Sequence, residues 1–171
     1  HTYDPKDIGR MEYKYNEVAR KCGINVPDYK LLDGKYFASK RFDIENGKRL
    51  HIATAGALLN ESISNPKLDY KVLLHLTGYL TQDSQQVDEM FQRMVFNVLT
   101  DNKDDHVKNF SFICREGKWS LAPAYDLTLC KEGYHGEHAT SANNKGNPDI
   151  EDMLAVGESC LLYTSPSPRD T

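Results

Sequence analysis

Apolar residues recur every three or four positions in two long segments, and this spacing predicts two helices. In residues 7–22 the apolar side chains fall on one helix face, and Gly23 follows as a left-handed stop. Asp83, with Gln86 three positions later, is a start signal of the capping-box type. The second segment then keeps the spacing without a break at Val87, Met90, Phe91, Met94, Val95, Val98 and Leu99. We therefore expect a helix at 7–22 and a buried helix that ends near residue 99.

Two pairs of short alternating segments predict β-hairpins. The stretch "YKLLDGKYFASKRFD" alternates around the turn signal Asp33-Gly34, with Tyr36–Phe42 as the second strand. Farther along, "FSFIC" and "WSLAP" flank "REGK", a polar loop of four residues that contains a glycine. The arms of this second hairpin are similar in length, so its end should return beside its start.

The remaining segments carry weaker signals. Residues 68–79 have a helical but less regular pattern, and "IEDMLAVG" indicates the first turns of another helix. Residues 131–149 are rich in Gly, His, Asn and Lys, which is typical of a mobile loop. The last stretch, "LLYTSPSPRDT", has neither periodicity nor packing capacity. We expect one folded core over residues 1–159 and a disordered or non-native tail over residues 160–171.

Charge and cysteine content narrow the function classes. The 171 residues include 21 Lys and Arg against 25 Asp and Glu, a net charge of −4 with a pI near 5.9. This balance gives no long-range attraction to a polyanion, so we expect no direct nucleic-acid partner. No apolar run has the length of a membrane span, and no signal peptide is evident. The four cysteines include no CxxC pair, which favours free, mostly buried thiols in the cytoplasm.

The polar stretch "TDNKDDHVKNFSF" follows the predicted helix and leads into the second hairpin, which ends at Asp126. The hairpin should bring Asp126 back beside Asp104 and Asn109. Two carboxylates and an amide suit a magnesium nucleotide, because hard oxygen ligands hold the metal and a separate carboxylate orients a hydroxyl nucleophile. Asp104 and Asn109 are also spaced as the base and the metal ligand in the kinase pattern D-x-x-x-x-N.

Several segments together resemble the HipA-like serine/threonine kinases, the toxins of bacterial type II toxin–antitoxin pairs. That family's catalytic loop is matched by "DDHVKNFSF", and its metal-binding Asp segment by "LAPAYDLT". The helix and strand that precede its nucleotide hinge are matched by "DPKDIGRMEYKYNEVARKCGINVPDYKLL", and the hinge itself by "SKRFD". The resemblance covers roughly residues 3–155 and is specific as a set.

The resemblance implies a helix-dominated α+β fold: a protein-kinase-like C-lobe of HipA type with part of the N-lobe and a β-hairpin after the catalytic loop. It implies ATP and Mg²⁺ as cofactors and transfer of the γ-phosphoryl group to a protein Ser or Thr hydroxyl. It implies as partners a protein substrate, for which an aminoacyl-tRNA synthetase is one candidate, and a cognate antitoxin. The roles that it implies for single residues are Asp104 as catalytic base, Lys108 as a stabiliser of the transferred phosphate, Asn109 and Asp126 as magnesium ligands, the Lys40 to Phe42 backbone as adenine-facing hinge, and Asp43 as a ribose contact.

The chain departs from the family pattern at its start. A complete kinase has a phosphate-covering loop and a strand lysine before the first helix, whereas this chain begins at His1, almost at that helix. Lys40 follows the helix, where the family places its hinge, so we do not assign it as the strand lysine. Glu12 could face such a lysine or lie exposed on the surface. We expect the chain by itself to be nearly inactive.

Other interpretations of the polar residues remain open. His106 could ligate a metal, although a histidine in such a loop more often holds the backbone in shape. His135 and His138 hint at zinc, but further ligands are not evident in the sequence. A metal-dependent phosphoesterase could use Asp101, Asp104, Asp105, His106 and Asp126. A third function class, beside the kinase and the phosphoesterase, is a catalytically silent, kinase-like binding module that docks a partner.

Overall fold

Helices form in the segments in which apolar residues recur at helical spacing. The computed structural model describes residues 7–64 and 68–161. Within them, five helices are present: α1 (Ile8–Lys21), α2 (Ala55–Leu59), α3 (Tyr70–Thr81), α4 (Ser84–Leu99) and α5 (Ile150–Leu161). Four of them were expected from the apolar spacing. Helix α2, with five residues, is too short to show a period.

The start of α4 differs in detail from a capping box. Asp83 caps the helix, because its carboxylate accepts a hydrogen bond from the Gln85 N–H at 2.9 Å. Gln86 does not bond back to the Asp83 N–H. Its Nε2 donates to the Asp83 carboxylate at 2.9 Å, and its Oε1 accepts from the Leu121 N–H at 2.7 Å. The Gln86 side chain therefore joins α4 to the second hairpin.

Three small antiparallel sheets accompany the helices. The pairs are β1 (Tyr29–Leu32) with β2 (Tyr36–Ser39), and β3 (Ile44–Glu45) with β4 (Lys48–Arg49). The third sheet has the strand order β5-β6-β7, formed by β5 (His51–Thr54), β6 (Ser111–Arg115) and β7 (Lys118–Leu121). Both predicted hairpins are confirmed, but β2 ends at Ser39 and does not extend to Phe42. The second turn comprises only Glu116 and Gly117, both at positive φ, so that Arg115 pairs with Lys118.

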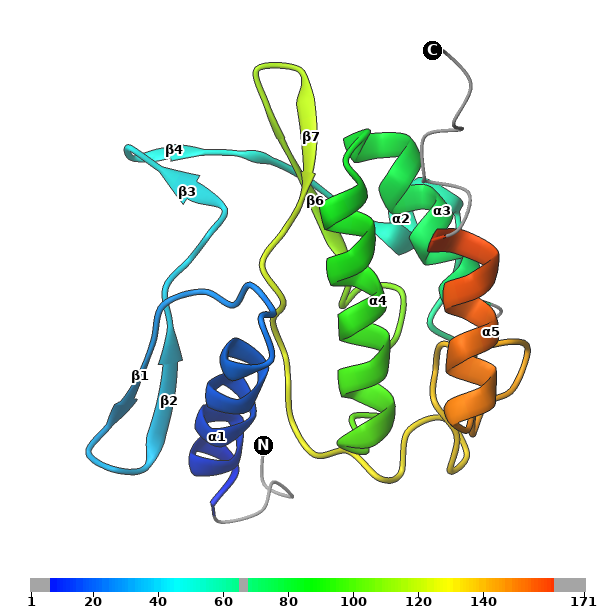
Figure 1. Ribbon diagram of the computed structural model, residues 1–171. Coiled ribbons are helices and arrows are strands. Elements are labelled where there is room, and N and C mark those ends of the chain that lie inside the picture. The colour runs from blue at the N-terminus through cyan, green and yellow to red at the C-terminus, as the bar shows by residue number, and fades with distance from the viewer. Residues whose placement is uncertain (1–6, 65–67, 162–171) are drawn as a thin grey trace.

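Two apolar clusters connect these elements. The larger one lies between α3, α4, α5 and the β6–β7 hairpin, and it includes the fully buried Tyr70, Leu73, Met90, Met94, Phe112 and Val156. The smaller one joins α1 to α4 through Ala19, Ile24, Val26, Phe96, Ala124 and Leu127. In Figure 1, α1 and the β1–β2 hairpin lie beside the helices α3 to α5, and the segment after β7 runs between the two parts. Asp126 lies in this segment.

Residues 131–149 are irregular, as expected, but part of this segment is not held loosely. His138, Thr140 and Ala142 are buried in this segment, with exposed fractions of 6%, 0% and 0%. The expectation of a mobile loop is therefore corrected for residues 138–142, because these side chains are packed and His138 and Thr140 are hydrogen-bonded to Asp105.

The expected start of the tail and the burial of the thiols also change. Helix α5 continues through Cys160, which is buried in the larger cluster, so this residue belongs to the folded part. Residues 162–171 of the expected tail lie outside the described residues. All four cysteines are free, but Cys22 is exposed and Cys114 and Cys130 are only partly buried, so the expectation of mostly buried thiols is wrong. In the described part of the chain, no helix combines the length and the apolar character that a membrane crossing needs.

Candidate active site

The loop after α4 and the segment after β7 meet in one narrow crevice, with a cavity volume of about 10 Å³, the space of roughly one water molecule. Asp104 and Asn109 line it from the loop, and Asp126 lines it from the segment. The hairpin β6–β7 leaves the loop and returns to it, which is the reason these three residues lie close together. The predicted convergence of Asp104, Asn109 and Asp126 on one site is confirmed.

Hydrogen bonds within the loop orient its side chains. Asn109 Nδ2 donates to the Asp104 carbonyl at 2.7 Å, and the Asn109 N–H donates to the His106 carbonyl at 2.8 Å. The Asn109 carboxamide oxygen is thus the atom that can ligate a cation. His106 Nδ1 accepts from the Lys108 N–H at 3.3 Å, so the histidine holds the backbone in shape. Its Nε2 lies 3.7 Å from Asp104 Oδ1.

Asp126 is aimed by its own backbone and by the preceding tyrosine. Its φ of +54° lies in the left-handed region, which is uncommon for a residue with a side chain. The Tyr125 hydroxyl donates to the Lys108 carbonyl at 2.5 Å and accepts from Ser111 Oγ at 2.5 Å. The Tyr125 ring stacks on Phe42, with ring centroids 5.5 Å apart. Tyr125 therefore connects the Asp126 segment to the loop, to β6 and to the predicted hinge.

The crevice is electronegative. The pKa of Asp104 is raised above its usual value, first because burial disfavours its charged form and then because Asp105 and Asp126 repel that charge, while His106 opposes the shift. The Asp104 side chain is about half exposed, with an exposed fraction of 54%, and so remains accessible to a ligand. A cation in the crevice would relieve the repulsion between the carboxylates.

A second cavity, of about 220 Å³, adjoins Asp126. Its walls come from α1, from β2 and from the segment after β7, and they comprise Glu12, Asn16, Pro27, Phe37, Ser39, Tyr125, Asp126 and Leu127. Apolar and polar side chains both contribute to these walls. Because Asp126 borders the cavity and the crevice alike, a ligand in one would meet a metal in the other. This volume lies below the roughly 300–1,000 Å³ of typical small-molecule sites.

The other residues predicted for the site lie outside these two hollows. The Lys40 ammonium lies 3.9 Å from an Asp28 carboxylate oxygen, and both side chains are largely exposed. The Asp43 carboxylate forms a salt bridge with the Arg41 guanidinium, which lowers the Asp43 pKa. Lys108 is exposed and does not line the crevice. Of the predicted hinge residues, Phe42 is thus the one that contacts the site, through Tyr125.

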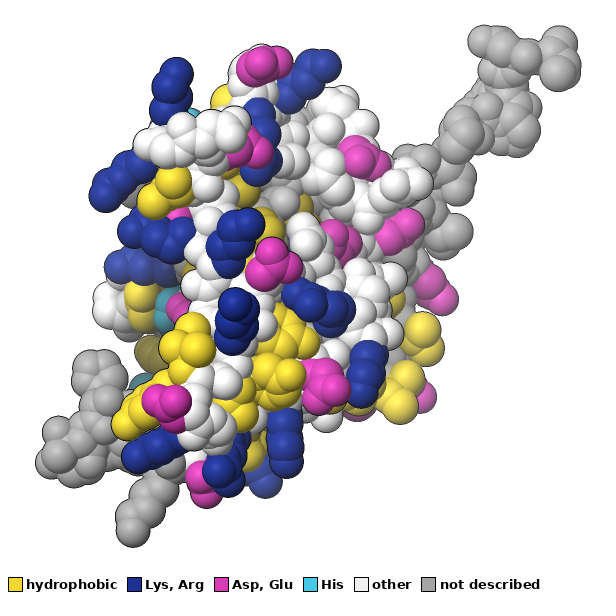
Figure 2. Space-filling model, turned by 90° about the vertical axis from the view of Figure 1, so that its left-hand side faces the viewer, with side chains coloured by type: hydrophobic (Ala, Val, Ile, Leu, Met, Phe, Trp, Pro, Cys, Tyr) yellow, Lys and Arg dark blue, Asp and Glu magenta, His cyan; other side chains and the backbone are white. Residues whose placement is uncertain are grey.

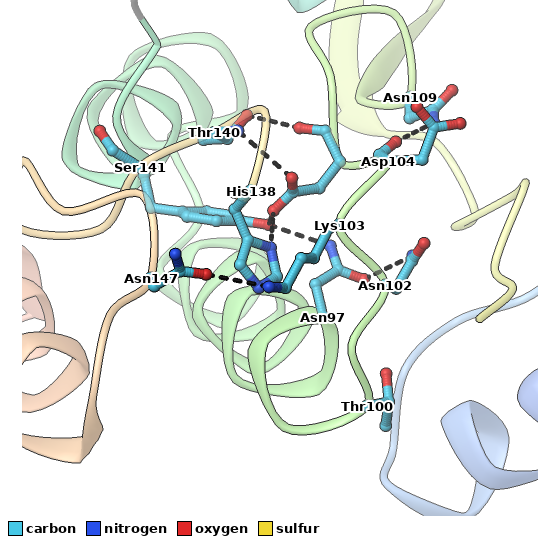
Figure 3. A network of polar contacts seen from close by, with 12 residues as sticks. Asn97, Thr100, Asn102, Lys103, Asp104, Asn109, His138, Thr140, Ser141 and Asn147 are labelled. Atoms are coloured by element: carbon cyan, nitrogen blue, oxygen red, sulfur yellow. Dashed lines mark hydrogen bonds and ion pairs between the residues drawn. The ribbon is translucent and has the colours of Figure 1, made fainter. Parts of the chain in front are cut away.

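A buried polar network beneath the loop was missed from the sequence (Figure 3). Asp105 is at its centre and binds Tyr70, His138 and Thr140. This network argues against two interpretations of the sequence. The Asp105 carboxylate is held by protein donors, which disfavours it as a metal ligand of a phosphoesterase. His138 binds Asp105, which disfavours a zinc site with His135. One signal was available: Arg93 and Asn97 lie four residues apart, within the apolar face of α4. Both are buried, and Asn97 belongs to the network.

The donor set of the crevice fits magnesium bound to phosphate. Within residues 7–64 and 68–161, no three His, Cys, Asp or Glu side chains are grouped so that they could hold a metal ion alone. Mg²⁺ typically takes one or two carboxylates from the protein and completes its shell with phosphate oxygens and water. Asn109 and Asp126 could supply such a partial set.

Comparisons with known proteins show what the chain as a whole is similar to. A curated relative, "Putative kinase Y4dM" of Sinorhizobium fredii, is 28% identical over 154 residues, which are 80% of this chain and 37% of that protein. The chain thus spans well under half the length of this relative. The HipA of Shewanella oneidensis MR-1, solved with HipB and its operator DNA, has a similar fold, with a TM-score of 0.75 at 21% identity over 92% of this chain and 44% of that one.

A second solved structure is more distant. The proinflammatory kinase CtkA of Helicobacter pylori has a TM-score of 0.55 at 19% identity, over 75% of this chain and 50% of that one. At such identities the two structures show a shared fold only. The family model "HipA-like C-terminal domain" matches residues 3–166, nearly the whole chain. The chain therefore belongs to the family of HipA-like C-terminal domains.

Proposed function

We propose that this chain is the catalytic core of an ATP- and Mg²⁺-dependent protein serine/threonine kinase of the HipA toxin type. In this proposal the fold corresponds to a kinase C-lobe with part of the N-lobe. The observation that carries the proposal is the crevice in which Asp104, Asn109 and Asp126 meet, next to a second cavity that Asp126 also borders. Membership of the HipA-like family supports it.

The three residues divide two roles in the proposed reaction. Asp104 is the base that orients the acceptor hydroxyl and takes its proton as the phosphoryl group is transferred. Its raised pKa favours this role, since a stronger base accepts the proton more readily. Asn109 and Asp126 would hold the magnesium ion, which would supply positive charge to the phosphate oxygens. Their fixed orientation, set by the loop hydrogen bonds and by the Tyr125 contacts, positions the reactants.

The nucleotide lies in the cavity between α1, β2 and Asp126 in this proposal. Phe37, Pro27 and Leu127 offer apolar contacts, and Asp126 connects the cavity to the crevice. The backbone from Lys40 to Phe42 remains the proposed hinge, with Phe42 stacked on Tyr125. A ribose contact by Asp43 requires that its carboxylate release Arg41. Lys108 would have to turn toward the crevice to reach a phosphate.

The phosphoesterase alternative is disfavoured by the hydrogen bonding of its ligands. A two-metal hydrolytic site needs several carboxylates with free oxygens, but both oxygens of Asp105 accept hydrogen bonds from buried protein donors. His106 Nδ1 is likewise occupied by the Lys108 N–H. A silent binding module retains the fold without nucleotide binding, so nucleotide binding separates it from the kinase.

The biological context of the proposal follows the relatives. Shewanella HipA was solved with HipB and operator DNA, so we propose an antitoxin partner for the protein that carries this chain. The substrate is a protein with a Ser or Thr acceptor, and an aminoacyl-tRNA synthetase remains one candidate. We place the reaction in the cytoplasm.

Calorimetry with MgATP tests the nucleotide site. Asn109→Ala and Asp126→Ala should each weaken MgATP binding by at least about tenfold, because each removes a metal ligand. Asp88→Ala is the matched control: it removes an exposed carboxylate on α4, outside both hollows, and should leave the affinity unchanged. Chelation of Mg²⁺ should lower the wild-type affinity as well. Equal affinity in all variants would place the nucleotide elsewhere, and no binding by wild type would favour the silent module.

A further inference from the structure

A buried carboxylate lies directly beside the proposed base. The Asp105 side chain is fully buried, and the His138 side chain is 3% exposed. Asp105 Oδ2 accepts from the Tyr70 hydroxyl at 2.7 Å and pairs with His138 Nδ1 at 2.9 Å. Asp105 Oδ1 accepts from the Thr140 N–H at 3.2 Å. Three donors from two distant parts of the chain thus converge on the residue that follows Asp104.

Two further side-chain hydrogen bonds lead from Asn102 through Asn97 to the Tyr70 hydroxyl, which donates to this carboxylate (Figure 3). Asn102 Nδ2 donates to Asn97 Oδ1 at 2.9 Å, and Asn97 Nδ2 donates to the Tyr70 hydroxyl at 3.0 Å. Burial, and then the charge of Asp105, raise the pKa of Tyr70 well above its usual value, so its hydroxyl keeps the proton that it donates. The Tyr70 hydroxyl and the Thr140 N–H both donate to the Asp105 carboxylate, and His138 Nδ1 lies within hydrogen-bond distance of it.

The network also fixes the backbone next to Asp104. The Asp104 carbonyl accepts from Asn109 Nδ2 at 2.7 Å, and the Asp105 carbonyl accepts from Thr140 Oγ1 at 2.5 Å. The two consecutive peptide groups after Asp104 are therefore both held by side chains. The Asp104 side chain itself stays partly exposed in the crevice.

His138 and Thr140 belong to an irregular segment, residues 130–142, which we name the clasp segment. It is bound to the same loop along its length: the Lys103 N–H donates to the Cys130 carbonyl, and the Cys130 N–H to the Asp101 carbonyl, each at 3.0 Å. Lys103 Nζ adds a bond to the Gly136 carbonyl at 2.8 Å. The position of the clasp segment and the shape of the loop are thus coupled.

We propose that Asp105 and His138 form a positioning pair, which uses the clasp segment to hold the loop of Asp104 in the geometry that phosphoryl transfer needs. The inference rests on the proposed function. A buried carboxylate that loses one donor is left with unsatisfied charge, so it cannot stay in place unchanged. A change at His138 should therefore move the loop of Asp104, although His138 itself does not line the crevice.

Three variants of one segment test the pair in the full-length gene product. His138→Leu keeps a side chain of similar bulk but removes the donor to Asp105. His138→Asn retains an N–H close to the position of Nδ1. His135→Leu is the matched control, since His135 lies exposed in the same segment. For each variant we would measure MgATP affinity, the rate of transfer from labelled ATP, and amide hydrogen exchange over residues 101–109, all well below the unfolding temperature.

His138→Leu should lower the transfer rate by about 10- to 100-fold and speed amide exchange over residues 101–109, with MgATP affinity changed less than about threefold. His138→Asn should recover most of the rate, and His135→Leu should match wild type. A purely structural role would lower rate and affinity together, in proportion to unfolding. Folded His138→Leu with wild-type transfer would overturn the inference.

The experiment distinguishes failure of the positioning pair from failure of the proposed function. If wild type transfers no phosphate, the proposed function fails, and amide exchange still decides whether His138 holds the loop: unchanged exchange in His138→Leu overturns the pair. If His138→Leu does not fold, Tyr70→Phe replaces it, because this change removes only the hydroxyl that donates to Asp105. The same split between rate and affinity is then expected.

Discussion

Asp126 combines a strained backbone with the side chain that the proposed site requires. A left-handed conformation costs a non-glycine residue about 1–2 kcal/mol, although Asp and Asn tolerate it best. Its φ of +54° turns the side chain into the crevice that Asp104 and Asn109 line. Strain of this kind is kept where the surrounding structure and the function require it.

Two substitutions at Asp126 measure this strain. Both Asp126→Gly and Asp126→Ala remove the carboxylate, but glycine adopts a positive φ without steric cost. The glycine variant should therefore be more stable than the alanine variant by about 0.5–1 kcal/mol, after allowance for the greater flexibility of unfolded glycine. Urea unfolding at pH 7 provides the comparison. The reverse order of stability would mean that residue 126 is not left-handed in solution.

The three main candidate site residues could be predicted from the sequence. The buried hydrogen bonds that fix their loop could not. Asp104 and Asn109 follow from their spacing, and Asp126 follows from the hairpin that returns to the loop. The pair Asp105 and His138 spans 33 positions of irregular chain. Neither periodicity nor turn chemistry fixes a distance across such a segment, so its polar residues indicated only a loop.

At the scale of elements, two helical glycines have opposite surroundings. A Cβ on Gly9 would lie 2.2 Å from the Lys35 carbonyl oxygen, because α1 packs directly on the β1–β2 hairpin there. A Cβ on Gly78 in α3 would meet only Val87, at an ordinary 3.4 Å. The first glycine is therefore required by packing, whereas the second is not.

Alanine at these two positions should change the free energy of unfolding in opposite directions. Gly9→Ala should destabilise the protein by about 1–3 kcal/mol, because backbone must move to admit the methyl group. Gly78→Ala should stabilise it by about 0.5–1 kcal/mol through helix propensity. Urea unfolding of both variants gives the two signs. A stabilising Gly9→Ala would contradict the contact between α1 and the hairpin.

The first turn of α5 contains a carboxylate with an unusually low pKa. Asp152 Oδ1 accepts from Asn143 Nδ2 at 3.0 Å, and its Oδ2 accepts from the Asp149 N–H at 3.1 Å and from Lys145 Nζ at 2.9 Å. These donors, Asn143 first, hold the Asp152 pKa well below its usual range. A carboxylate whose pKa is lower in the folded state stabilises the fold above the unfolded pKa, and this contribution is lost as the pH falls.

Asp152→Asn should therefore destabilise the protein at pH 7, and the difference from wild type should shrink as the pH falls below about 4. Urea unfolding at several pH values checks the trend. Glu151→Gln is the control for the loss of one negative charge in the same turn, because Glu151 is exposed there. A difference between Asp152→Asn and wild type that does not vary with pH would contradict the ionic role of Asp152.

Elements with strong local patterns were predictable, and those that depend on distant partners were not. Apolar spacing located α1, α3, α4 and α5, and turn residues located both hairpins. Strand β5 was missed, because its four residues owe their conformation to pairing with β6, which lies far along the chain. The mobility expected for residues 138–142 was wrong for the same reason: their partners, such as Asp105 and Asp69, lie in distant segments.

For the whole molecule, the net charge conceals an uneven distribution. Residues 7–54 contain ten Lys and Arg against seven Asp and Glu, a balance of +3, whereas residues 68–161 contain eight against 15, a balance of −7. Figure 2 shows the face of α1 and the first strands, where Lys and Arg side chains surround apolar ones. The net charge of −4 therefore describes neither part. The expectation that nucleic acid does not bind was based on this net charge, which averages a positive part and a negative part.

The account as a whole depends on Asp104 acting as the base. We would measure transfer from labelled ATP to protein, together with MgATP affinity, for wild type, Asp104→Asn and the control Asp101→Asn in the full-length gene product. Asp101 lies in the same loop but does not line the crevice. Asp104→Asn should lower transfer by at least about 100-fold with affinity changed less than about threefold, while Asp101→Asn retains activity. A wild-type transfer rate in Asp104→Asn would contradict the assigned base and the proposed mechanism with it.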